Sequence, residues 1–192
     1  MKRKFWLFYI VSIGCWLLPF AVRVFFVEMP EITSEHLEHL PAEKRQSVAQ
    51  EVVRMLSSGD RYEAFITIFI NNLKGCIINI AGGVLFGLGT LFSLMFNGFF
   101  SADMFASSYK SGLSIEAILK VTLPHSFELI GFWLSGAIGF YIAWNIIQFM
   151  RGKGTFTSHF YKRTGICSLA VFIIILAAAY VEAYISTSII PR

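Results

Sequence analysis

The amino-acid sequence predicts an all-α protein, a polytopic transmembrane helix bundle of about five spans that forms a single membrane domain over residues 1–192. The first reason is composition: 56% of the residues are hydrophobic and 15% are charged, whereas a soluble domain carries about 25% charged residues. The second is that long apolar runs alternate with polar segments. The third is that basic residues flank the apolar runs, as membrane topology signals do. The net charge of +4 is explained by these flanking basic residues, so it does not indicate a nucleic-acid partner.

The first span is predicted over residues 1–27. Lys2, Arg3 and Lys4 precede an apolar run that begins at Phe5. This run is longer than the ~7–15 apolar residues of a secretory signal peptide, and no A-x-A-like cleavage site follows it. We therefore expect an uncleaved first helix.

The next segment, residues 28–63, is predicted to be an external helical loop. Between residues 28 and 64 there are eight acidic and four basic residues, so this segment should lie on the opposite side of the membrane from the basic N-terminus. Apolar residues recur within it at helical spacing, which predicts an amphipathic helix on the membrane interface or against the bundle. They are Val48, Val52, Met55 and Leu56.

The apolar stretch over residues 64–100 is predicted to be a helical hairpin. A single helix of this length would span ~55 Å, whereas the hydrocarbon core of a bilayer is ~30 Å thick. The chain must therefore fold back, and Gly82-Gly83 is the expected hinge between helices 64–81 and 84–100. Both helices would be short, so a re-entrant hairpin is the alternative to two full spans.

Two further spans are predicted at residues 126–150 and 166–188, after an external connection over residues 101–125. The loop between them, residues 151–165, carries four basic residues and no acidic residue. Basic short loops favour the cytoplasm. We therefore expect a cytoplasmic N-terminus and an extracytoplasmic C-terminus.

Six polar side chains fall within or beside the predicted spans, where such groups are costly and usually serve a purpose. They are Asn71, Asn72, Lys74, Asn97, His125 and Glu128. The simpler interpretation is a set of interhelical hydrogen bonds with an ion pair between Lys74 and Glu128. The alternative is a polar cavity that binds or conducts a solute. Arg23, near the end of the first span, is expected to extend to the membrane interface.

The sequence predicts no metal site, no cofactor and no catalytic residue. His125 and Glu128 share one helix face, but a metal ion needs further ligands, and no H-E-x-x-H motif is present. His36 and His39 are better explained by a charged, solvated helix start than by a divalent-cation site. The cysteines lie in apolar runs without C-x-x-C spacing and are expected to act as small hydrophobic residues. They are Cys15, Cys76 and Cys167.

Small residues recur at four-residue spacing on the third and fourth predicted helices, a pattern that lets helix backbones approach closely in lipid. They are Gly83, Gly87, Gly131, Ser135 and Gly139. This pattern fits packing within one chain, and it also fits an interface with a partner or a second copy. A homo-oligomer therefore stays open.

Two segments resemble the stage II sporulation protein M family. The first is FINNLKGCIINIAGGVLFGLGTLFSLMFNGF, with its paired asparagines and its glycine series, and the second is LPHSFELIGFWLSGAIGF, with its H-x-x-E spacing. The resemblance covers roughly residues 64–145. Ser126 is a departure, because the family pattern leads us to expect glycine after His125, and it puts the local turn in doubt.

The resemblance implies a cell-membrane protein. The named member of the family works in engulfment during endospore formation, where it is regarded as a scaffold or localiser for extracytoplasmic peptidoglycan-degrading enzymes. For this chain we therefore expect a non-enzymatic, multi-pass membrane scaffold of a cell-envelope complex, with membrane lipid and envelope proteins as partners. The alternative is a permease-like component that exports or binds a peptide, lipid or small solute. An intramembrane hydrolase is the third and weakest hypothesis.

Overall fold

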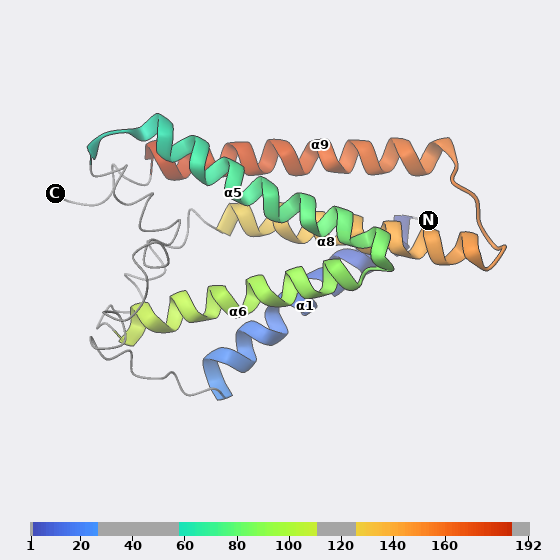
Figure 1. Ribbon diagram of the computed structural model, residues 1–192, viewed down its shortest axis with the longest axis horizontal. Helices are drawn as coiled ribbons and strands as arrows, with labels where there is room; N and C mark the ends of the chain where they lie inside the picture. The colour runs from blue at the N-terminus through green and yellow to red at the C-terminus, as the bar shows by residue number, and fades with distance from the viewer. Residues whose placement is uncertain (1, 27–57, 111–125, 186–192) are drawn as a thin grey trace.

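A computed structural model describes residues 2–26, 58–110 and 126–185, and within these ranges the chain is helical and has no strand (Figure 1). The all-α class is confirmed. The helices are α1 (Lys2–Phe26), α5 (Arg61–Ala81), α6 (Leu88–Lys110), α8 (Ser126–Met150) and α9 (Ser158–Tyr180), with a 3-10 helix, η1 (Gly82–Leu85), after α5 and a π-helical segment, η2 (Val181–Ile185), after α9. The predicted amphipathic helix lies outside the described residues.

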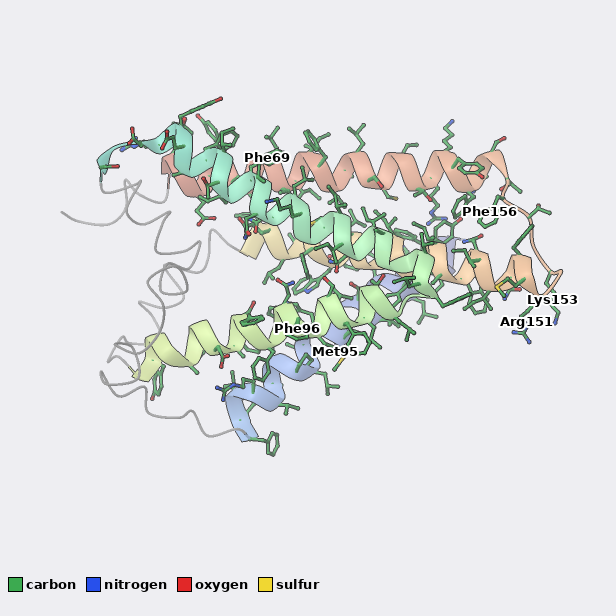
Figure 2. All side chains as sticks on the ribbon, viewed as in Figure 1. Phe69, Met95, Phe96, Arg151, Lys153 and Phe156 are labelled. Atoms are coloured by element: carbon green, nitrogen blue, oxygen red, sulfur yellow. The ribbon has the colours of Figure 1, made fainter. Side chains whose placement is uncertain are left out.

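Four of the five long helices in the described part of the chain are long and apolar enough to cross a membrane. They comprise Phe5–Phe26, Arg61–Leu85, Phe127–Met150 and Ser158–Tyr184. The 23-residue helix α6 is not among them, because polar side chains such as Asn97 and Asp103 interrupt its apolar run. Large apolar side chains nevertheless project outward from α6, including Met95 and Phe96 (Figure 2). A fifth span at α6 therefore stays a prediction.

The helices place their ends in two groups (Figure 1). The start of α1, the turn between α5 and α6, and the loop 151–157 lie toward one end, called here the N-terminal end. The starts of α5 and α8 and the ends of α1, α6 and α9 lie toward the other, called here the far end. The N-terminus and the basic loop thus share one end, as predicted. Their assignment to the cytoplasm stays a prediction.

Helix α8 occupies the centre of the bundle and packs against α1, α5 and α9. Its sequence is apolar on all sides, which suits a helix with neighbours around most of its circumference. The buried core draws on all five long helices, and its residues are Trp16, Cys76, Leu94, Phe132, Ile138, Val171 and Ile175. Burial of these side chains against α8 aligns the other four helices around it.

The hairpin reverses at a different position from the expected hinge. Gly82 and Gly83 lie in η1, which continues the direction of α5. The chain turns at Phe86 (φ 55°) and Gly87 (φ 83°), two consecutive residues with left-handed backbone. Glycine adopts this conformation without a steric penalty, and a right-handed helix cannot continue through it. The prediction of a hinge at the paired glycines was therefore wrong by about one helical turn.

Two helix boundaries also differ from the prediction. α6 continues to Lys110, so the first part of the predicted external connection is helical. α9 begins at Ser158 rather than at residue 166, because the Thr157 side chain caps it by accepting a hydrogen bond from the Phe160 backbone N–H at 3.3 Å. The predicted basic loop is consequently shorter, and its last two basic residues lie on the first turns of α9.

Arg23 does not extend to the interface as expected. Its side chain is buried, with Nε 2.7 Å from Oδ1 of Asp103. The guanidinium also lies 5.2 Å from the ring centroid of Phe99. Both partners belong to α6, so this contact fastens the end of α1 to the second half of α6. This ion pair could not be predicted from the sequence, because Asp103 was expected in an external connection.

Candidate functional site

Four small polar side chains in the interior of the bundle are completely buried. Ser12 comes from α1, Asn79 from α5, Thr90 from α6 and Ser135 from α8. We call them the central polar cluster. Because bilayer lipid supplies no hydrogen bonds to such groups, they depend on partners within the protein. Asn79, Thr90 and Ser135 form hydrogen bonds, whereas Ser12 Oγ has no hydrogen-bond partner among the described residues.

Hydrogen bonds within the central polar cluster connect three helices. The Asn79 amide donates from Nδ2 to Oγ of Ser135 at 2.9 Å and to the backbone oxygen of Phe132 at 3.4 Å. Ser135 Oγ in turn donates to the same Phe132 oxygen at 2.6 Å. Thr90 Oγ1 donates to the backbone oxygen of Asn79 at 2.7 Å. The cluster therefore ties α5 to α8 and closes the α5–α6 hairpin.

Glycines allow the backbones to approach closely enough for these bonds. A methyl group on Gly139 of α8 would overlap the backbone oxygen of Asn79 and Oγ1 of Thr90. One on Gly83 would overlap the backbone oxygen of Gly139, and one on Gly82 would overlap the backbone nitrogen of Thr90. Gly83 thus lies where the hairpin crosses α8, and Gly82 lies where the start of α6 passes the end of the first hairpin helix. Close helix approach through small residues is the usual basis of packing in lipid.

The five small residues predicted for helix packing all contact other helices of the same chain. Gly83 meets Gly139, and Ser135 bonds to Asn79. A methyl on Gly131 would come within 2.9 Å of Ile175 Cδ1 on α9, and one on Gly87 within 3.3 Å of side-chain atoms of α8. These small residues are covered by other helices of the same chain. They therefore leave no free surface at these positions for packing against a second copy.

The six polar residues that the sequence analysis named as an intramembrane cluster do not gather at one place in the described structure. Asn71, Lys74 and Asn97 are exposed on the bundle surface, and Asn97 Nδ2 donates to the Ser93 backbone oxygen of its own helix at 3.2 Å. Asn72 and Glu128 are half-buried, and His125 lies outside the described residues. None of the five described residues belongs to the central polar cluster, and the Lys74–Glu128 ion pair stays a prediction.

Sequence reasoning missed Asn79. Its signal was present, because it is a single amide within the apolar run CIINIA and lies three residues before the paired glycines. Glycines that admit a second helix and an amide on the preceding turn together indicate a hydrogen bond across that crossing. Asn71 and Asn72 attracted attention as a pair, but a pair at i and i+1 cannot point into one interface.

The three cysteines form no disulfide bond in the described structure. Cys76 is buried in the core, Cys15 and Cys167 are half-buried, and all three are free thiols. Within residues 2–26, 58–110 and 126–185, no group of three His, Cys, Asp or Glu side chains is placed to hold a metal ion.

Hollows on the described surface include one between α1 and α8 and one on α9. One is lined by Phe5, Trp6, Tyr9, Ile130 and Leu134, between α1 and α8. The other follows one face of α9 near its start and is lined by His159, Lys162, Arg163, Ile166 and Cys167. Neither is lined by a residue of the central polar cluster.

Comparison with known proteins gives a consistent result. The sequence model of the family described as stage II sporulation protein M matches residues 5–187. An uncharacterized protein of Methanocaldococcus jannaschii is 32% identical over 128 residues, which cover 65% of this chain and 72% of that protein. No solved structure matches.

Proposed function

This chain belongs to the stage II sporulation protein M family, and from that premise we propose that it is a non-enzymatic scaffold or localising subunit of a cell-envelope complex. The chain is an integral membrane protein, with four described helices long and apolar enough to span a bilayer. In the proposed role it holds other envelope proteins in place and performs no chemistry itself.

The observation that supports the proposal most directly is that buried polar groups form hydrogen bonds within the bundle. The amide of Asn79 and the hydroxyls of Thr90 and Ser135 are engaged in bonds between or within the helices of the bundle. The surrounding glycines leave less than a methyl group of space at the crossing of the hairpin and α8. Polar groups used in this way stiffen a bundle, and a stiff bundle suits a protein that positions others.

The permease-like alternative requires a polar path that reaches the middle of the membrane. The hollow between α1 and α8 and the hollow on α9 both open outward, and residues of the central polar cluster do not line them. The packing at Gly83 and Gly139 is also too close for a solute to pass between these backbones. The scaffold is therefore the function that we propose.

Charge distribution supports a docking surface at the far end. The described carboxylates all belong to segments at that end (Figure 1). They are Asp60, Glu63, Asp103, Glu128 and Glu182. The N-terminal end instead carries cations, including Arg151 and Lys153 (Figure 2). Since basic segments favour the cytoplasm, we propose that the far end is extracytoplasmic and that envelope proteins, including cell-wall enzymes, dock there.

The test is a mild-detergent pull-down of the tagged chain from its native membrane, with mass spectrometry of the bound proteins. The scaffold predicts recovery of envelope proteins with extracytoplasmic domains. A triple variant, E31Q/E35Q/E38Q, removes three charges from the acidic segment that precedes α5, and it should reduce this recovery.

The matched control is R151Q/K153Q, which changes charge at the N-terminal end and should leave recovery unchanged. Recovery of an ATPase or of a bound solute without envelope proteins would contradict the scaffold and favour the permease. A homo-oligomer, which the sequence left open, would be seen as co-purification of a second, differently tagged copy.

A further inference from the structure

The hollow on α9 combines a cationic half with an apolar half. Its five lining residues, at 159, 162, 163, 166 and 167, follow the spacing i, i+3, i+4, i+7 and i+8, so they share one helix face. The hollow has a volume of about 400 Å³. The two cations lie on the first turns of α9, and Ile166 and Cys167 follow about 6 Å further along the helix. We call this feature the basic hollow.

Aromatic rings hold one of these cations in place. The guanidinium of Arg163 lies 4.6 Å from the ring centroid of Phe5 on α1 and 5.7 Å from that of Tyr141 on α8. The Tyr141 ring in turn stacks on Phe160 at a centroid distance of 5.6 Å. Ring faces attract the charge of a guanidinium but leave its five N–H donors available for an anion. Arg163 is therefore preorganised without being neutralised.

The surroundings of the basic hollow are positively charged. In the part of the chain that the structure describes, no carboxylate forms an ion pair with Lys162 or Arg163. The nearest charged residues along the chain, Arg151 and Lys153, are also cations and project from the same end of the bundle (Figure 2). The described carboxylates lie at the far end (Figure 1). An anion from outside the chain is thus the natural counter-charge.

We propose that the basic hollow binds the phosphate headgroup of an anionic phospholipid, with an acyl chain lying along Ile166 and Cys167. Lys162 and Arg163 supply charge-assisted donors for the phosphate oxygens. The cations of the hollow lie nearer the start of α9, and its apolar residues lie nearer the middle of the helix. This order matches the order of headgroup and acyl chain in a leaflet. Basic sites on the cytoplasmic side of membrane helices meet the leaflet richest in anionic lipid. This inference rests on membrane insertion and on the predicted cytoplasmic position of the N-terminal end, and it does not depend on the scaffold role.

Native mass spectrometry of the full chain in mild detergent tests the proposal, with dioleoyl phosphatidylglycerol as the anionic lipid and dioleoyl phosphatidylcholine as the zwitterionic one. We expect tighter binding of phosphatidylglycerol. The double variant K162Q/R163Q should weaken it roughly 25-fold, because each cation near an anionic lipid contributes about a factor of five. The control R151Q/K153Q removes the same charge from the same end and should stay within about twofold of the parent.

Two further variants separate recognition from folding, because Arg163 also packs on Phe5 and Tyr141. H159Q/K162Q leaves these aromatic contacts intact and should still weaken binding by about fivefold. R163K keeps the charge and should retain most of the binding. Equal losses in K162Q/R163Q and R151Q/K153Q would overturn the proposal in favour of diffuse electrostatics. Equal affinity for both lipids, or displacement of the lipid by millimolar inorganic phosphate, would also overturn it.

Discussion

The hydrogen bond between Asn79 and Ser135 can be measured directly by a double-mutant cycle. Asn79 Nδ2 lies 2.9 Å from Ser135 Oγ, and both residues are completely buried. The variants are Asn79→Ala, Ser135→Ala and the double substitution. Each removes one partner, so the cycle isolates the energy that the two side chains share.

The expected magnitude follows from burial and geometry. Interhelical hydrogen bonds in membrane proteins average about 0.6 kcal/mol and reach about 1.7 kcal/mol. The 2.9 Å bond has near-ideal length and joins two completely buried side chains, so we expect a coupling energy of about 1–1.7 kcal/mol. The single variant Asn79→Ala is less informative, because it leaves a small cavity but also removes Oδ1, a buried atom without a hydrogen-bond partner among the described residues.

The assay is reversible unfolding in mixed micelles of increasing dodecyl sulfate content, followed by tryptophan fluorescence. Trp16 and Trp133 report on the core, since their rings pack edge to face at 5.7 Å. Asn97→Ala combined with Ser135→Ala is the control cycle, because Asn97 bonds only to its own helix among the bonds described here and is exposed. If the destabilisations caused by Asn79→Ala and Ser135→Ala add within about 0.3–0.5 kcal/mol, the hydrogen bond between these side chains does not stabilise the bundle as proposed.

Five further substitutions test other parts of the packing. Gly139→Ala should destabilise the bundle by about 1–3 kcal/mol through overpacking against the hairpin, whereas Gly165→Ala, where a methyl meets no atom within 4 Å, should be neutral or stabilising by up to about 1 kcal/mol in the same unfolding assay. Asp103→Asn should destabilise more than Arg23→Gln, because it leaves the more buried partner, Arg23, as an uncompensated charge; equal stability of the parent and Asp103→Asn would show that the ion pair contributes nothing. Gly87→Ala should cost about 1–2 kcal/mol, since φ is 83° there, and an unchanged midpoint would argue against the left-handed turn.

Much of the fold could be predicted from the sequence because the bilayer imposes simple rules. Apolar runs of sufficient length between polar segments defined α1, α5 and α8 within a few residues. The length of the 64–100 stretch required a reversal. The position of that reversal could not be predicted from glycine content alone, because the paired glycines serve close packing while the left-handed turn falls at Phe86 and Gly87.

The candidate site was harder to predict because residue type does not reveal which face of a helix is buried. Asn71, Lys74 and Asn97 are as polar as Asn79, yet they are exposed. Asn79 is distinguished by the crossing of α8, where Gly139 packs against Gly83 and against the backbone oxygen of Asn79. The Arg23–Asp103 contact was hidden for a similar reason, since it depends on α6 extending past residue 100.

Cysteine accessibility tests most directly the claim that the interior of this protein is closed and structural. Cys76 precedes Asn79 by three residues on α5 and is only 1% exposed. In a C15A/C167A variant it becomes a specific reporter of water at the bundle centre, and Thr155→Cys in a cysteine-free background provides an exposed reference. If the interior is closed, a small, water-soluble methanethiosulfonate leaves Cys76 unmodified in membranes while the residue-155 thiol reacts completely. Modification of Cys76 at a rate comparable to the reference would reveal an aqueous path through the centre and contradict the scaffold in favour of a permease.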